Sequence, residues 1–214
     1  MFVNPLPSLR NLLKSHKIKH MAATIEADFI GNYMRKIATV PPQKMSPVFR
    51  YALHILPYIF VRASELASAK WEDVDFSAAQ WRYTVSKTNT PHIVPLAPQV
   101  IKLLQELHTY TGDTPFLFPQ CNKMRSIQGK YLIATLRRLG YTGEQMTIHG
   151  FRAVARTMLD EVLGERYDLI EQQLAHCVRD PNGRAYNRTV HLPERTRMME
   201  RWANYLDELR DKAE

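Results

Sequence analysis

The chain has few cysteines and no long apolar run. Only two of its 214 residues are cysteine, and Cys121 and Cys177 lie in different segments with no paired spacing. This pattern argues against a disulfide framework and predicts a protein of the reducing cytoplasm. The richest apolar stretch, residues 51–61, is interrupted by His54 and Pro57 and is far shorter than the ~20 residues of a membrane span. No membrane partner is therefore expected.

Acidic residues are in deficit. The chain has 21 Asp and Glu against 29 Lys and Arg, which gives a formal net charge of +8 and a pI near 9.5. Such a surface attracts polyanions, and nucleic acid is the commonest of these. A basic protein that binds no nucleic acid can have the same composition. Charge alone therefore does not show whether this protein binds nucleic acid. Pro5, Pro7, Lys14 and Lys17 interrupt any apolar region near the N-terminus, so no secretory signal is expected.

Internal repeats and low-complexity tracts are also lacking. Hydrophobic residues make up 45% of the chain, which is enough for a real core, and the length suggests one domain with an arm. Residues 1–22 are basic and contain prolines, so we expect a linker or arm there. Residues 23–214 then form the domain.

Helical periodicity dominates this domain. Ile25, Phe29, Tyr33 and Ile37 recur at four-residue steps and predict one face of a helix over residues 25–37. Gly140 and Gly164 stand where the C-terminal glycines of helices usually do. Further helices are expected at about residues 47–57, 63–70, 98–110, 126–139, 150–163, 167–175 and 193–210.

Residues 71–96 have a different character. Large apolar and polar side chains alternate over residues 81–85, as in a half-buried strand, and residues 92–95 suggest a second strand. Residues 87–91 between them have the composition of a turn, and residues 74–76 suggest a third strand. The predicted fold class is therefore mainly α with a small antiparallel three-stranded sheet.

Several polar residues are ambiguous when each is taken alone. Arg62 borders an apolar run and has Glu65 three residues on, which by itself indicates a salt bridge. A lysine in a hairpin turn, such as Lys87, usually faces solvent. The functional alternative is that the flexible turn carries its ammonium group to a leaving group. His149 and Arg152 share a face at the start of a helix, where an anion is favoured, but two solvated side chains have the same spacing.

The last two candidates follow the same pattern. His176 comes at the end of a helix, where a cation is favoured, and so can simply cap it. Tyr186 comes ten residues later, between Arg184 and Arg188, and either packs as an aromatic or carries a phenolate stabilised by these cations.

The order of these residues is more specific than any one of them. The series Arg62, Lys87, His149, Arg152, His176 and Tyr186 closely resembles the catalytic domain of the tyrosine recombinases, the phage integrase family. The resemblance runs from about residue 25 to residue 209, nearly the whole chain. It rests on RASEL at residues 62–66, WEDVD at 71–75, PHIVPL at 91–96, TIHGFR at 147–152 and LAH at 174–176. AYNR at residues 185–188 and MERWA at 199–203 are most similar to prophage and satellite-phage integrases.

The resemblance implies a chemistry. Tyr186 would attack a DNA phosphate to form a 3′-phosphotyrosyl bond, while Arg62 and Arg152 hold its non-bridging oxygens. Lys87 would protonate the leaving 5′ oxygen, His149 would help to move the tyrosine proton, and His176 would donate a hydrogen bond to the phosphate. The implied function is site-specific DNA cleavage and rejoining in the integration or excision of a mobile element.

No cofactor and no metal are implied. His149, His176 and His191 lack tight ligand spacing and carboxylate support, which argues against a zinc site. Two other functions remain open from the residues: a non-catalytic DNA-binding module, and an enzyme of the type IB topoisomerase kind. A helical scaffold for protein partners explains neither the charge nor the ordered motifs.

The implied partners are double-stranded DNA, other integrase protomers, and directionality and DNA-bending proteins. Longer members of the family carry core-binding and arm-binding domains. We expect neither in this chain, which would then be a catalytic fragment or a naturally short form with weak, salt-dependent DNA affinity. Residues 193–210 suit the C-terminal segment that the family exchanges between protomers, but without DNA we expect this helix to pack on its own domain in a monomer. The expected location is the cytoplasm of a bacterial host, on the nucleoid when DNA is bound.

Overall fold

The computed structural model describes residues 24–176 and 191–213. The expected linker or arm, residues 1–22, and Tyr186 lie outside these ranges. The helices are α1 (Ala27–Thr39), α2 (Pro47–Ile59), α3 (Ala63–Ala67), α4 (Pro98–Thr111), α5 (Gly129–Arg138), α6 (Gly150–Glu161), α7 (Tyr167–Gln173) and α8 (Leu192–Lys212). The strands are β1 (Val74–Asp75), β2 (Gln80–Val85) and β3 (Thr90–Pro95), preceded by a 3-10 turn, η2 (Trp71–Asp73). This architecture confirms the predicted fold class.

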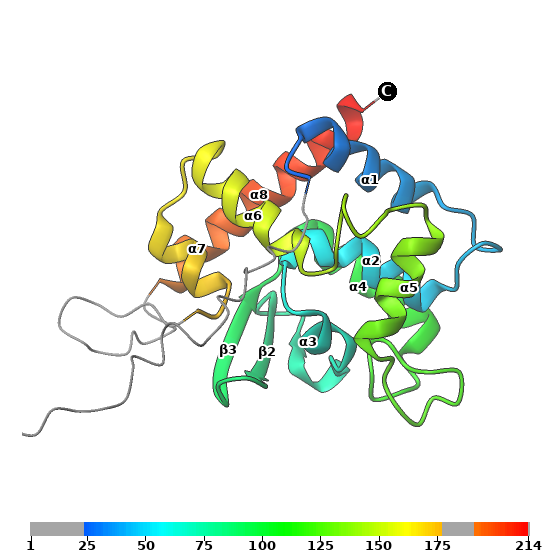
Figure 1. Ribbon diagram of the computed structural model, residues 1–214. Helices are drawn as coiled ribbons and strands as arrows, with labels where there is room; N and C mark the ends of the chain where they lie inside the picture. Colours follow the sequence, from blue (N-terminus) through cyan, green and yellow to red (C-terminus); the bar gives the residue numbers. More distant parts are fainter. Residues whose placement is uncertain (1–23, 177–190, 214) are drawn as a thin grey trace, which may run out of the picture.

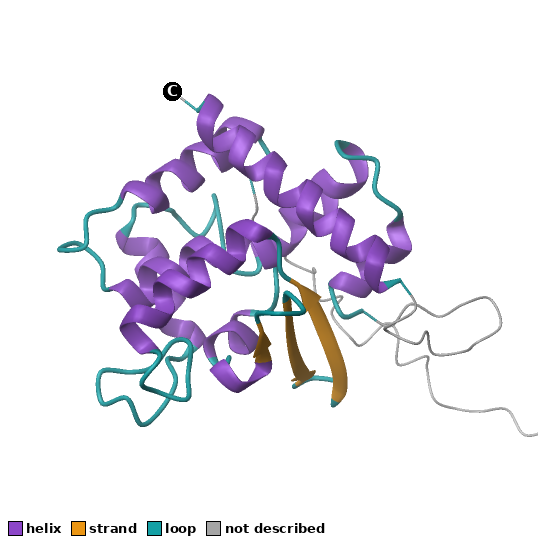
Figure 2. Cartoon of the chain, turned by 180° about the vertical axis from the view of Figure 1, so that it is seen from behind, coloured by secondary structure: helices purple, strands orange, loops and turns teal. Residues whose placement is uncertain are grey.

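Helix α2 lies at the centre of the helical layer and contacts α1, α3, α4, α5, α6 and α8 (Figure 1). Eight of its residues are buried, in agreement with the apolar run in the sequence. The hairpin of β2 and β3 projects from one side of this helical body, as the view from behind also shows (Figure 2). No described helix combines the length and the apolar character that a membrane span needs.

Pro57 lies inside α2, which continues to Ile59 instead of ending at the proline as the sequence suggested. A proline has no N–H, so it leaves the carbonyl of the residue four positions earlier without its helical donor. The hydroxyl of buried Tyr33 donates to that carbonyl, Leu53 O, at 2.8 Å. The indole N–H of Trp202 donates to Pro57 O at 2.9 Å. Side chains from α1 and α8 therefore supply hydrogen bonds along the end of this helix.

The sheet has the order β1-β2-β3, with both pairs antiparallel. Trp81 pairs with Val94, and Tyr83 pairs with His92, so these side chains share one face. Trp81 and Tyr83 stack with ring centroids 4.4 Å apart, and Tyr83 meets His92 edge to face at 5.5 Å. The alternation seen in the sequence thus places an aromatic face toward the helices.

Two helices differ from the predicted bounds for a visible reason. α5 begins at Gly129 and not near residue 126, because Ser126 forms a bridge with Pro119, and Ile127 N–H donates to Phe118 O at 2.8 Å. α3 ends at Ala67 because Lys70 forms a bridge with Phe116. In both places a loop pairs with residues that the sequence pattern assigned to a helix.

Helix α8 packs on its own chain, mainly against α1 and also against α2, α7 and β3, as we expected in the absence of DNA. Gly31 of α1 allows the closest approach, since a Cβ built on it would lie 2.3 Å from the carbonyl oxygen of Leu209. That atom belongs to the backbone of α8, so the two helices would have to move apart to accept a side chain.

Gly31→Ala is expected to lower the free energy of unfolding by about 1–3 kcal/mol, because overpacking outweighs the better helix propensity of alanine. Urea and thermal unfolding measure the effect. Asn32→Ala is the matched control, since Asn32 is the next residue of the same helix and is exposed. Equal stability of the two variants would contradict the close α1–α8 contact.

Candidate active site

Arg152 connects three segments that are far apart in the sequence. It lies in the first turn of α6, it is only 4% exposed, and its Nη1 donates to Phe60 O at 2.9 Å. Its Nη2 donates to Leu174 O at 2.7 Å and lies 3.4 Å from His176 Nε2. One guanidinium therefore binds the end of α2 to the end of α7. Arginine has five N–H donors, so donors remain for an anion.

Two residues in a left-handed conformation lie next to the expected site residues. Phe60, two residues before Arg62, has a φ of 38°, and Ala175, directly before His176, has a φ of 52°. This conformation is unfavourable for any residue with a side chain, and it concentrates at functional sites. Here it turns the chain sharply where α2 and α7 end.

Arg62 is the N-cap of α3 and is held by a buried carboxylate. Its Nη1 donates to Glu65 Oε1 at 2.8 Å, and its backbone N–H donates to Glu65 Oε2 at 3.0 Å. The hydroxyl of Tyr83 also donates to Glu65 Oε2, at 3.0 Å. The side chain of Glu65 is 2% exposed and that of Arg62 is 20% exposed, so the carboxylate is inside while the guanidinium reaches the surface. The predicted salt bridge is present and orients the arginine.

His176 is oriented by a second buried carboxylate. Its Nδ1 lies 2.7 Å from Glu171 Oε2, and its backbone N–H donates to Glu171 O at 3.0 Å. Glu171 Oε1 also accepts from Arg156 Nε at 2.7 Å. Burial raises the pKa of Glu171, but the hydrogen bonds from His176 and Arg156 outweigh it, so the pKa lies below its ordinary value.

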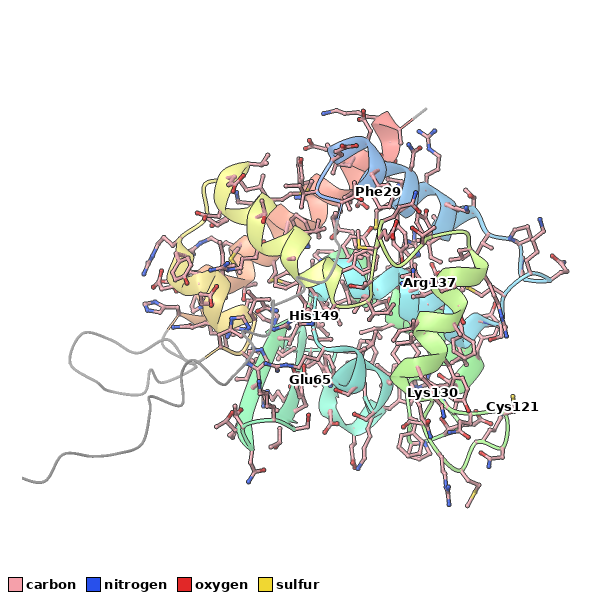
Figure 3. The ribbon with its side chains drawn as sticks, in the orientation of Figure 1. Phe29, Glu65, Cys121, Lys130, Arg137 and His149 are labelled. Carbon is pink, nitrogen blue, oxygen red and sulfur yellow. The ribbon has the colours of Figure 1, made fainter. Side chains whose placement is uncertain are left out.

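His149 is the N-cap of α6 and completes the cluster. Its pKa is lowered by partial burial and then by the charges of Arg152, Arg62 and His176. Figure 3 labels His149 and Glu65 near one another in the centre of the molecule, at the start of α6 and in α3. Four of the six residues singled out in the sequence are thus brought together.

The four grouped residues form a cation-rich site. Burial and then the charge of Arg62 lower the pKa of Arg152 to about 10, still far above neutral pH, so Arg152 remains charged. Placing like charges together away from water is unfavourable unless anions offset it, and the carboxylates of Glu65 and Glu171 do so in part. The N-terminus of α6 adds the positive end of a helix. The arrangement is suited to an anion with several oxygens, such as a phosphate.

Lys87 lies apart from this cluster. It is exposed in the turn of residues 86–89 that joins β2 to β3, as the sequence predicted. A hollow of about 720 Å³ separates the hairpin from α3, and Glu65, Tyr83 and His92 form part of its wall. The structure therefore places the lysine on the same hairpin as Tyr83 but does not bring it to Arg62 or Arg152.

Tyr186 lies outside the described residues, but the described residues on either side are anchored at the site. His176 is itself a member of the cluster. On the other side, Arg195 of α8 donates through Nη2 to Gln173 Oε1 and to Ile93 O, both at 2.5 Å. His176 and α8, between which Tyr186 lies in the sequence, are thus both connected to the end of α7.

The sequence indicated Glu65 only as a salt-bridge partner and did not indicate Tyr83 or Glu171 as site residues. Tyr83 was visible only as an apolar position of a strand. Glu171 comes five residues before His176, a spacing with no familiar motif. Its role depends on the left-handed turn at Ala175, which no sequence signal indicated.

Comparison with known proteins gives consistent results. The family model described as "Phage integrase family" matches residues 29–188. The integrase of Enterobacteria phage P4 is 33% identical over 98% of this chain and 51% of its own length. The chain therefore spans about half the length of this relative.

Two solved structures share the fold. A lambda integrase dimer bound to a COC′ core site matches with a TM-score of 0.60 and 13% identity, over 78% of this chain and 62% of the other. The lambda integrase catalytic core matches with a TM-score of 0.54 and 17% identity, over 78% of this chain and 98% of the other.

Proposed function

The chain belongs to the phage integrase family, and from this premise we propose that it cuts and rejoins DNA strands at specific sites. The proposed reaction passes through a 3′-phosphotyrosine intermediate and serves the integration or excision of a mobile element. The observation that supports it most strongly is the grouping of Arg62, His149, Arg152 and His176 into one cation-rich site. Such a site fits a phosphodiester that gains negative charge as it is attacked.

The proposed roles follow from the positions of the groups. Arg62 and Arg152 hold the non-bridging oxygens, for which planar guanidinium groups are well suited. The Tyr186 oxygen forms a bond to phosphorus as the bond from phosphorus to the 5′ oxygen breaks. His149 takes the phenolic proton, and Lys87 gives a proton to the departing 5′ oxygen. The reverse attack by a 5′-hydroxyl of a partner strand restores the phosphodiester and releases the tyrosine.

Lys87 and Tyr186 both have to approach the phosphate for this reaction. Tyr186 comes ten residues after His176 and five before His191. Since an extended chain spans up to about 3.6 Å per residue, either tether gives the tyrosine ample reach from an anchored end. Lys87 is in an exposed turn beside a hollow, so a DNA strand has room to lie between it and α3.

The lowered pKa of His149 predicts how cleavage depends on pH. Protonation removes the proposed base, so the single-turnover cleavage rate should fall as the pH drops below histidine's ordinary value of about 6.5. His149→Asn should cleave slowly and should lose this acid limb. DNA binding measured at each pH separates a loss of affinity from a loss of chemistry. If the acid limb persisted unchanged in His149→Asn, another group would be the base.

We further propose that residues 23–214 form the catalytic domain and that residues 1–22 are a linker or arm. Double-stranded DNA would be the partner, and other protomers would join on it. Directionality and DNA-bending proteins would be further partners. We place the reaction in the cytoplasm of a bacterial host, on the nucleoid when DNA is bound, in keeping with a relative from a phage. Exchange of α8 between protomers would require its contacts with α1 to break, because in this structure α8 packs on its own chain.

A suicide-substrate assay tests the function. The probe is a nicked duplex made from DNA that flanks the gene, incubated with the protein in the presence of EDTA. A protein–DNA band that survives denaturation supports the enzyme. A gel shift without such a band would support a non-catalytic DNA-binding module. Relaxation of any supercoiled plasmid would favour a type IB topoisomerase, whereas strand exchange between paired flanking sites favours an integrase.

A further inference from the structure

Glu171 has a position in the site that neither the sequence pattern nor the proposed roles account for. Its carboxylate is largely buried, with 10% of the side chain exposed, and it lies between the guanidinium of Arg156 and the imidazole of His176. One oxygen is 2.7 Å from His176 Nδ1, and the other accepts from Arg156 Nε at 2.7 Å. On the far side of the imidazole, His176 Nε2 lies 3.4 Å from Arg152 Nη2. The imidazole is thus held between a carboxylate and the proposed phosphate site.

We propose that Glu171 is a positioning residue that fixes the orientation and the tautomer of His176, so that Nε2 faces the scissile phosphate. The inference rests on the proposed function, because it concerns the same site. Glu171 does not itself touch the phosphate in this arrangement and acts only through the imidazole.

The tautomer follows from the chemistry of the two partners. An ionised carboxylate only accepts hydrogen bonds, so Nδ1 must carry the proton that it shares with Glu171. In the neutral imidazole, Nε2 is then an acceptor and can take a hydrogen bond from Arg152. Once protonated, Nε2 becomes a donor that points toward an anion bound at the arginine. Fixing Nδ1 therefore determines which nitrogen serves the phosphate.

Arg156 keeps the carboxylate in place. Besides binding Glu171, its Nη2 donates to the hydroxyl of Tyr167 at 3.1 Å, and its guanidinium lies 5.4 Å from the centre of the Tyr167 ring. These contacts join α6 to the first turn of α7. The carboxylate of Glu171 is thus restrained from one side while it orients the histidine on the other.

Glu65 offers an internal parallel. It is the other buried carboxylate beside the cluster. Its two oxygens accept hydrogen bonds from the guanidinium and from the backbone N–H of Arg62. Glu171 also holds His176 at two points, but with two different groups: its carboxylate lies 2.7 Å from the imidazole Nδ1, and its backbone carbonyl accepts from the His176 N–H. Each residue binds one member of the cation-rich site, so the site has one orienting carboxylate at α3 and one at α7.

The first test is the tautomer of His176, read from the imidazole nitrogen signals of the free protein by ¹⁵N NMR. The pH is set well above the ordinary pKa of histidine, and a His176→Asn variant identifies the signals. The wild type should carry its proton on Nδ1. In Glu171→Gln, Arg156 can only donate and therefore draws the amide oxygen, which leaves the amide NH₂ facing Nδ1. The proton should then move to Nε2, and an unchanged tautomer would overturn the proposal.

The second test is the rate of covalent adduct formation. Glu171→Gln should slow it about 10- to 100-fold, by analogy with the loss when a carboxylate that orients a metal-binding histidine is removed. The double variant Glu171→Gln/His176→Asn should be no slower than His176→Asn, because the carboxylate acts through the histidine. Losses that multiply in the double variant would show that Glu171 acts independently and would overturn the proposal.

Glu165→Gln is the matched control. Its carboxylate is also 10% exposed and pairs with an arginine, Arg201, at 3.0 Å, but it lies outside the site. Glu165→Gln should form the adduct at the wild-type rate. A loss of rate equal to that of Glu171→Gln would show that altering any buried ion pair slows the reaction, and it would contradict a specific role for Glu171. The NMR measurement needs no DNA, so a wild type that formed no adduct would refute the proposed function while the tautomer still decided the role of Glu171.

Discussion

Tyr186→Phe should abolish the covalent protein–DNA adduct while leaving DNA binding intact. The substitution removes one oxygen, which is the atom proposed to form the bond to phosphorus, and phenylalanine has no nucleophilic atom in its place. A free phenol has a pKa of about 10, so its attack at neutral pH depends on a base and on nearby cations. In the proposed mechanism, His149 is the base and the two arginines are the cations. A denaturing gel of the suicide-substrate reaction measures the result directly.

Tyr83→Phe is the most informative control, because Tyr83 is a tyrosine that the structure places beside the site. Burial, and then the negative charge and hydrogen bond of Glu65, raise the pKa of Tyr83 well above its ordinary value, so its phenol is a poor nucleophile. Tyr131→Phe is a second control, since Tyr131 is exposed and also has a cation, Lys130, against its ring. Both variants should form the adduct. An adduct lost in Tyr83→Phe and kept in Tyr186→Phe would move the nucleophile to the hairpin.

Arg152→Ala should slow cleavage by about 10²- to 10³-fold, the usual loss when one preorganised donor to a developing negative charge is removed. Arg152→Lys should also be strongly impaired, because a lysine cannot keep the bonds to both Phe60 O and Leu174 O and still meet the phosphate with a planar fork. Single-turnover cleavage at saturating protein measures the chemical step. DNA affinity should change far less than the rate.

Arg152 also joins α2 to α7, so its replacement can slow cleavage by destabilising the fold. A control variant is needed to separate this effect from the loss of phosphate binding. Arg137→Lys is suitable because Arg137 likewise donates to two backbone carbonyls, those of Tyr141 and Met146. Both lysine variants should lose stability in urea unfolding, since a carbonyl loses its donor in each. Only the Arg152 variant should lose cleavage. Equal losses of cleavage in the two variants would assign the effect of Arg152 to folding.

Much of the fold was predictable because it depends on local patterns. The four-residue spacing in α1, the alternation in β2, and Gly140 and Gly164 after their helices all indicated the elements that form. Both glycines have positive φ angles, as their positions at helix ends require. The bounds of α2 were less predictable. Pro57 is compatible with a helix here because Tyr33, twenty-four residues earlier in the sequence, supplies a hydrogen bond to Leu53 O.

The sequence predicted which residues belong to the candidate site, but it did not predict how they are arranged in space. Arg62, His149, Arg152 and His176 came from motif order, and each had an ordinary structural interpretation when taken alone. The structure adds that Arg152 is buried and connects the segments of the other residues. It also adds Glu171, whose contact with His176 Nδ1 depends on a backbone turn and not on a sequence spacing. Tyr186 remains a prediction from the sequence.

The sequence by itself determined the elements, the basic charge and the ordered set of reactive residues, because periodicity and side-chain chemistry are local properties. Only the tertiary structure decided which of these residues share one site, since Arg62, Arg152 and His176 meet through the carbonyls that Arg152 holds at the ends of α2 and α7. It also decided that the buried carboxylate of Glu171 orients His176, a contact that no sequence spacing indicated. The hydrogen bonds of Arg152 to Phe60 O and Leu174 O join residues 92 and 22 positions apart in the chain, and packing alone brings them within hydrogen-bonding distance.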